Sequence, residues 1–214
     1  MENAANQART SRKGLNIFYY GKGKGKTTAA MGLAVRAAGA GMNVFVLQFV
    51  KAKRPEDGEK LQPGEWPISS EISLFEELEE LRAKNKNDPN VQKIGAIENT
   101  QIGLGFVGML GDRKLFSAHV EEAHRGLDRA RELITSDKYD LIVLDELVSA
   151  LELQLITEQE ILNLLSAKPK HLHLAYTGHD KFDKIIAASD MVSEINMVKH
   201  PFYDGILAQR GIDF

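Results

Sequence analysis

Blocks of continuous apolar residues alternate along this chain with blocks whose apolar positions recur every three or four residues. The continuous blocks have the β-branched and aromatic character of buried strands, whereas the periodic blocks are typical of helices that bury one face. Strands are predicted at residues 15–20, 43–49, 141–147, 171–178 and 191–197. Helices are predicted at residues 26–40, 72–87, 116–134, 157–168 and 180–190. This alternation predicts an α/β fold with a mostly parallel sheet and helices on both of its faces.

The helix predicted at 116–134 has the clearest single apolar stripe, with spacings of four and three between Phe116, Val120, Ala123, Leu127, Ala130 and Ile134. The helix at 157–168 begins with a capping box. In the helix at 72–87 the apolar positions Ile72, Phe75, Leu78 and Leu81 stand among acids, which we interpret as a solvated face.

Breaker residues and composition define the domain organisation. Residues 1–13 are polar and predict a flexible arm, and residues 14–214 suit one domain. Prolines and glycines between residues 51 and 70 predict an ordered surface loop.

No apolar run is long enough to cross a bilayer, and no secretory signal precedes the first strand, so a cytoplasmic location is expected. A net charge of -3 without a basic half argues against a nucleic-acid partner, and zero cysteines exclude thiol chemistry.

The segment GKGKGKTT at 21–28 lies between a predicted strand and a predicted helix, as a phosphate-binding loop requires. Its glycines permit a tight turn of backbone N–H groups around an anion, its lysines supply cations, and the first threonine can place a hydroxyl on Mg²⁺. The residues predicted to bind ATP are Gly21, Lys22, Gly23, Lys24, Gly25, Lys26, Thr27 and Thr28. Tyr20 stands where the common pattern has a glycine, so the loop is a compact variant of this P-loop motif. The alternative is a basic glycine-rich turn without a ligand.

Two acids close the apolar strand at 141–147, and we predict that Asp145 and Glu146 hold Mg²⁺ together with Thr27. The alternative is a pair of acids that simply ends a buried strand. Ligands of open parallel sheets bind beyond the carboxyl ends of the strands, which makes Lys51 a candidate ligand contact. A solvated lysine is the competing interpretation there.

Four segments together show a resemblance to a known family: the loop GKGKGKTTAA, LQFVKA at 47–52, LIVLDEL at 141–147 and the tail VKHPFYDGILAQRGIDF at 198–214. In these the chain resembles the ATP-dependent corrinoid adenosyltransferases. The resemblance implies a nucleotide-binding α/β fold, a homodimer, Mg²⁺-ATP as adenosyl donor, and transfer of the 5′-deoxyadenosyl group to the Co(I) of a corrinoid with release of triphosphate. It also implies a reductase that supplies the electron.

The resemblance assigns catalytic roles to Lys26, Glu146 and Phe106. Co(I) is itself the nucleophile, so the protein has to orient two substrates and stabilise charge on the leaving triphosphate. The family usually carries a Gly-Phe-Thr-Trp stretch against the lower face of the corrin, and this chain has GFVG at 105–108, which keeps Phe106. The usual Thr-Gly-Arg becomes Thr177-Gly178-His179, and residues 71–100 are longer than the usual connection.

Two other functions fit the same residues. A P-loop ATPase or small-molecule kinase would use the same loop and the same acids for phosphoryl transfer. A nucleotide-binding homologue without adenosyltransferase activity would follow if the altered GFVG stretch prevents alkylation.

Overall fold

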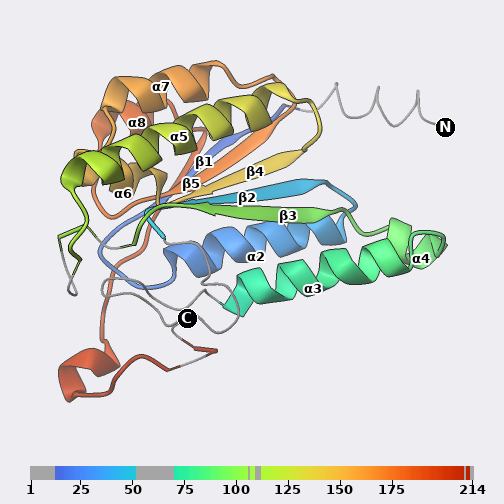
Figure 1. Cartoon of the computed structure of the whole chain (residues 1–214), viewed down its shortest axis with the longest axis horizontal. Coiled ribbons are helices and arrows are strands. Elements are labelled where there is room, and N and C mark those ends of the chain that lie inside the picture. The colour runs from blue at the N-terminus through green and yellow to red at the C-terminus, as the bar shows by residue number, and fades with distance from the viewer. Residues whose placement is uncertain (1–12, 52–69, 106, 109–111, 210, 213–214) are drawn as a thin grey trace.

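The computed structural model describes residues 13–51, 70–105, 107–108, 112–209 and 211–212, and its centre is a six-stranded sheet (Figure 1). The strands follow the order β3-β2-β4-β5-β1-β6, and every neighbouring pair is parallel. Their bounds are β1 Asn16–Tyr20, β2 Val44–Phe49, β3 Ile97–Ile102, β4 Leu141–Asp145, β5 His173–Thr177 and β6 Met191–Glu194. The predicted α/β fold class with a parallel sheet is therefore confirmed.

Helices cover both faces of the sheet (Figure 1). One layer consists of α2 (Lys26–Gly39) and α3 (Ser70–Lys84), and the other of α5 (Phe116–Thr135), α6 (Leu147–Glu152), α7 (Glu158–Ser166) and α8 (Asp183–Ala187). The short α4 (Pro89–Gln92) precedes β3, and a 3₁₀ turn (Pro201–Asp204) lies in the C-terminal segment. Two clusters of buried apolar side chains, one beneath each layer, form the core.

The predicted amphipathic patterns hold for most positions. In α5, Ala123, Leu127, Ala130 and Ile134 are buried, but Phe116 is 51% exposed because it begins the helix beyond the edge of the sheet. The capping box of α7 is present between Thr157 and Glu160.

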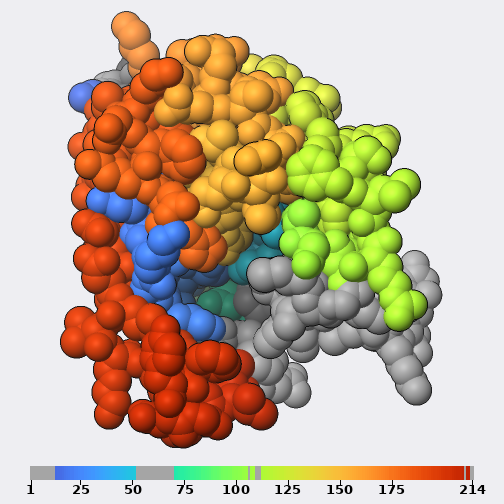
Figure 2. Space-filling model, turned by 90° about the vertical axis from the view of Figure 1, so that its left-hand side faces the viewer, coloured from blue at the N-terminus to red at the C-terminus, as the bar shows by residue number. Residues whose placement is uncertain are grey.

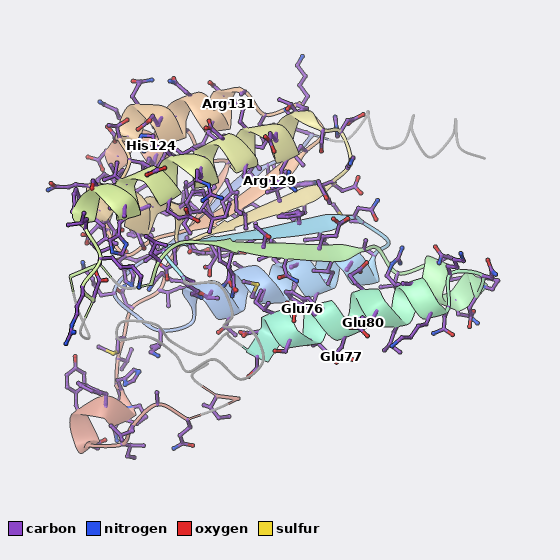
Figure 3. The ribbon with its side chains drawn as sticks, in the orientation of Figure 1. Glu76, Glu77, Glu80, His124, Arg129 and Arg131 are labelled. Atoms are coloured by element: carbon purple, nitrogen blue, oxygen red, sulfur yellow. The ribbon has the colours of Figure 1, made fainter. Side chains whose placement is uncertain are left out.

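In α3 the apolar face is shorter than predicted. Ile72 and Phe75 are buried, whereas Leu81 is 53% exposed. The acids Glu76, Glu77 and Glu80 of this helix are exposed, as the prediction of a solvated face required (Figure 3).

Several element boundaries differ from the sequence predictions. No strand was predicted at β3, because four of the six residues in its sequence IENTQI are polar, which suits an edge strand with one neighbour. The strand predicted to end at residue 147 stops at Asp145, since Leu147 already begins α6. The helix predicted at 180–190 is only the short α8, and β6 ends at Glu194. Most of the predicted arm and of the loop at 51–70 lies outside the described residues. Among the helices that the structure describes, none has the length and apolar character needed to cross a bilayer.

Candidate active site

The carboxyl ends of the strands bring the predicted site residues to one edge of the sheet. The strand order places β1 beside β5, β5 beside β4 and β4 beside β2, so the segments that follow these strands meet there. The surface at this edge is hollowed where the blue loop after β1 faces the orange segments after β4 and β5 (Figure 2). This position agrees with the general location of ligand sites in open parallel sheets.

The phosphate loop is bonded through its backbone to the segments that follow both strands next to β1. Gly21 donates its N–H to the carbonyl of His179 at 3.1 Å, and Gly23 donates to the carbonyl of Ile195 at 2.8 Å. Gly21 has a φ of 124°, and a Cβ there would lie 2.3 Å from the carbonyl oxygen of Ile195. Only glycine fits this position, because both the conformation and the close approach exclude a side chain.

The loop ends at Gly25, which caps α2 in a left-handed conformation with a φ of 111°. Glycine has no side chain that could accept a hydrogen bond from the first turn of the helix. The first-turn N–H groups of Lys26, Thr27 and Thr28 have no carbonyl four residues earlier within the helix to bond. They and the positive end of the helix dipole make a site for an anion.

The three lysines of the loop have different environments. Lys26 is 7% exposed and donates from Nζ to the carbonyls of Gly21 and Gly23, both at 2.8 Å. Burial lowers the pKa of Lys26, against the opposing effect of nearby carboxylates. Lys22 is exposed and pairs with Asp180, which raises the pKa of Lys22. Lys24, like Thr28, is exposed. The ammonium inside the loop is thus that of Lys26, whereas that of Lys22 lies at its rim.

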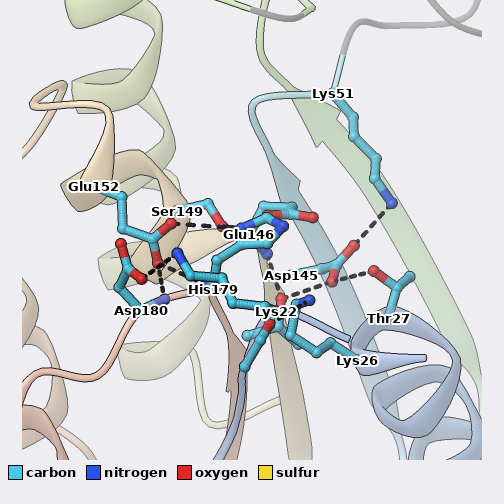
Figure 4. Close-up of polar contacts among 12 residues, drawn as sticks. Lys22, Lys26, Thr27, Lys51, Asp145, Glu146, Ser149, Glu152, His179 and Asp180 are labelled. Carbon is cyan, nitrogen blue, oxygen red and sulfur yellow. Dashed lines mark hydrogen bonds and ion pairs between the residues drawn. The ribbon is translucent and has the colours of Figure 1, made fainter. Parts of the chain in front are cut away.

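Asp145 is fully buried at the end of β4 and accepts four hydrogen bonds. Its Oδ1 accepts from the hydroxyls of Thr27 and Thr177, both at 2.9 Å, and its Oδ2 accepts from Gln48 at 2.9 Å and from Lys51 at 3.1 Å (Figure 4). Burial alone would raise the pKa of Asp145, but Lys51 and the hydrogen bonds hold it below its ordinary value. A carboxylate whose ionised form is favoured therefore lies next to Thr27, the second residue of the helix that follows the phosphate loop.

Lys51 points at this carboxylate and is not a fully solvated lysine, since its side chain is 33% exposed. Burial opposes its charge, yet Asp145 and Glu146 raise the pKa of Lys51 above its ordinary value. Val50, which precedes it, has a φ of 66°. A positive φ is a true outlier for a β-branched residue, and such strain is often found at functional sites.

Glu146 also has a left-handed backbone, with a φ of 62°, and it caps α6. Its N–H donates to the hydroxyl of Thr177 at 2.7 Å. Burial and the adjacent Asp145 raise the pKa of Glu146. The surroundings thus favour the ionised form of Asp145 and oppose ionisation of Glu146.

The donor set fits Mg²⁺, which prefers oxygen ligands and is usually held by one or two carboxylates together with substrate phosphates and water. In the described part of the chain, no three histidines or acids come together as a metal cage. Thr27 offers a hydroxyl, and Glu146 offers a carboxylate. Asp145, whose acceptor positions are all occupied, suits the role of orienting the hydroxyl of Thr27.

The sequence did not reveal every residue of this arrangement. Thr177 joins Asp145 to Glu146, and Ser149, Glu152 and Asp180 surround His179 (Figure 4). These residues lie on separate segments whose proximity depends on the strand order. Of these residues, Thr177 could have been found by its position, because it ends a strand that lies next to β4.

Phe106, the predicted corrin contact, lies outside the described residues, as does Trp66. Two residues after Phe106 in the sequence, Gly108 donates its N–H to Oδ2 of Asp112 at 3.0 Å, and the same oxygen lies 3.0 Å from Nε2 of His119. The bond from Gly108 is the main reason that the pKa of Asp112 is lowered to about 2. Both side chains of this pair are 3% exposed.

Comparison with known proteins decides among the functions that this geometry allows. The family model of the ATP:corrinoid adenosyltransferases BtuR/CobO/CobP matches residues 12–214. The chain belongs to this family. The corrinoid adenosyltransferase of a Sinorhizobium species is 31% identical over 96% of the chain and 83% of its own length. The corrinoid adenosyltransferase CobA of Salmonella typhimurium is 30% identical over 94% and 86%, and that of Pseudomonas aeruginosa 31% over 97% and 87%.

Membership confirms the resemblance found in the sequence. The chain is an ATP:corrinoid adenosyltransferase, a transferase with ATP and a corrinoid as substrates. The alternatives of an ATPase, a kinase or an inactive homologue are not favoured. The roles of individual residues remain predictions, which the geometry now makes specific.

Proposed function

We propose that the phosphate loop and the cluster around Asp145 hold Mg-ATP with its triphosphate in the loop and its ribose 5′ carbon toward the corrinoid. The observation that carries this proposal is the 2.9 Å hydrogen bond from the hydroxyl of Thr27 to Asp145. It joins the first turn of α2, where an anion binds, to the buried carboxylate of β4, where a divalent cation is expected.

The reaction needs no general base. The electron pair of Co(I) forms the bond to the 5′ carbon, the bond from that carbon to the phosphate oxygen breaks, and the triphosphate leaves with the electrons. Mg²⁺, when bound, supplies positive charge next to the leaving phosphates. What the chain supplies is position and charge, from the N–H groups of the first turn of α2, from Lys26 and from Lys51.

Each predicted residue then has a distinct task. Lys26 contacts the phosphates, after exchanging its bonds to the loop carbonyls for bonds to phosphate oxygen. Thr27 and Glu146 contact the metal ion, and Asp145 fixes Thr27. Lys51 balances the charge of Asp145 and faces the phosphates. Phe106 contacts the corrin, as the family resemblance implies.

Product analysis tests this proposal. The protein is incubated with ATP, Mg²⁺ and cob(I)alamin generated chemically beforehand, and the nucleotide and phosphate products are separated. Adenosylcobalamin and triphosphate in equal amounts are expected. ADP and inorganic phosphate without adenosylcobalamin would contradict adenosyl transfer at this site.

The quaternary structure and the electron donor are also part of the proposal. A homodimer is supported by the large apolar side chains that the C-terminal segment exposes: Val198, Phe202, Tyr203, Leu207 and Ile212. Light scattering should give twice the 23.8 kDa mass of one chain, and a mass of one chain would contradict it. A separate reductase in the cytoplasm is expected to supply the electron, as the family resemblance implies.

A further inference from the structure

The turn that follows β5 is bonded to the phosphate loop at two points. The carbonyl of His179 accepts the N–H of Gly21 at 3.1 Å, and the carboxylate of Asp180 forms an ion pair with Nζ of Lys22. One contact fixes the backbone at the start of the loop, and the other fixes a cation at its rim. The position of Lys22 therefore depends on the position of this turn.

One carboxylate contacts the turn at three points. Oε1 of Glu152 accepts the N–H groups of both His179 and Asp180, each at 2.7 Å, and Oε2 lies 3.4 Å from Nδ1 of His179. Hydrogen bonds to an ionised acceptor are stronger than neutral ones, and this side chain is only 14% exposed, which limits competition from water. Glu152 is thus the main anchor of the turn.

The same face of α6 also reaches the metal side of the site (Figure 4). Glu146, Ser149 and Glu152 are spaced three residues apart, which places them on one side of the helix. The hydroxyl of Ser149 lies 3.0 Å from Nδ1 of His179. Gly178 packs so closely on α6 that a Cβ there would lie 2.5 Å from Cβ of Val148. The helix and the turn therefore form one packed unit.

We propose that Glu152 is a positioning residue for the triphosphate, acting through the turn at 179–180 on Lys22. When Glu152 is removed, two backbone N–H groups lose their acceptor, and Asp180 no longer holds the ammonium of Lys22 at the rim of the loop. The inference rests on the proposed function, because it requires that the loop bind the triphosphate.

Binding of inorganic tripolyphosphate, measured by calorimetry in the presence of Mg²⁺, tests the proposal on the full chain. Glu152→Ala should weaken binding by roughly fivefold to tenfold, less than the full loss of a contact to a charged group, because Lys22 is displaced and not removed. Glu152→Gln should stay within about twofold, because an amide oxygen can still accept both N–H groups. An equal loss in Glu152→Gln would show an effect of charge alone and overturn the proposal.

Glu79 provides a matched control, since this glutamate of α3 also accepts a backbone N–H, that of Ile97, at 2.8 Å. Glu79→Ala should leave tripolyphosphate binding unchanged, whereas a loss as large as that of Glu152→Ala would make the effect non-specific and contradict the proposal.

Combining the change with Lys22→Met separates positioning from general destabilisation. If Glu152 acts through Lys22, Glu152→Ala should have almost no further effect on binding in the Lys22→Met background. The full loss in that background would overturn the inference. Lys26→Ala distinguishes a failure of this inference from a failure of the proposed function. Unchanged tripolyphosphate binding in Lys26→Ala would show that the loop does not bind the triphosphate.

Discussion

The phosphate loop and the cluster around Asp145 are adjacent, but they use their polar groups in opposite ways. At the loop, the first-turn N–H groups of α2 have no acceptor within the helix, and Gly25 offers no cap. In the cluster, Asp145 is fully buried and already accepts four hydrogen bonds from side chains of other segments. The loop is thus ready for an anion, whereas the cluster is a completed network that fixes Thr27 and Lys51 beside it.

Lys26→Ala should have the largest effect on ligand binding, because it removes the ammonium inside the loop. Contacts to charged groups contribute about 1.5–3 kcal/mol, so ATP affinity should fall roughly 10- to 150-fold. Calorimetric titration with Mg-ATP measures the change. An affinity like that of the wild type would show that the loop does not bind the phosphates.

Asp145→Asn should affect both stability and ligand binding, in contrast to Lys26→Ala. The NH₂ group of asparagine would replace one carboxylate oxygen and would face either Gln48 and Lys51 or the two threonines, all of which are donors. The buried groups would then be poorly paired, at a cost of about 1–3 kcal/mol. Urea unfolding should reveal this loss of stability, and the Mg²⁺ titration of activity should shift to higher concentration. Wild-type stability would contradict the description of a completed network.

Thr177→Val preserves the shape of the side chain and removes the hydroxyl that links Asp145 with the N–H of Glu146. We expect a loss of about 1–2 kcal/mol of unfolding free energy, because the partly buried N–H of Glu146 loses its acceptor. ATP affinity should change much less than in Lys26→Ala. If ATP affinity fell as strongly while stability stayed constant, Thr177 would belong with the ligand contacts.

Asp112→Asn serves as a reference outside both regions. The pKa of Asp112 is lowered to about 2 from an ordinary value of 3.8, so its ionised form stabilises the fold above about pH 4. That contribution is lost as the pH falls through about 2. The difference in melting temperature between wild type and Asp112→Asn should therefore shrink on acidification from pH 5 to pH 2. A difference in melting temperature that stays constant with pH would contradict an ionised, hydrogen-bonded carboxylate at Asp112. The ATP affinity of Asp112→Asn should equal that of the wild type.

The two regions also differ in how far the sequence predicts them. GKGKGKTT is one continuous segment between a strand and a helix, so its position and its tight turn follow from local rules. Thr177 and Glu152 become site residues only because β5 lies beside both β4 and β1, and strand order is not encoded in any local pattern. The strand β3 was missed for a different reason, since four of its six side chains are polar. Lys51 was predicted at the correct edge, but its bond to Asp145 depends on the pairing of β2 with β4.

The most direct test of the claim that the two regions form one Mg-ATP site uses Thr27, the residue that joins them. ATP affinity is measured by calorimetry with saturating Mg²⁺ and with the metal chelated, in wild type and in Thr27→Val. The wild type should bind ATP more tightly with Mg²⁺, and Thr27→Val should lose most of this increase while its metal-free affinity stays within about twofold, because the variant keeps the backbone N–H groups and lacks only the hydroxyl. A full Mg²⁺-dependent increase in Thr27→Val would contradict the account, since the metal ion would then bind away from the junction of the loop and Asp145.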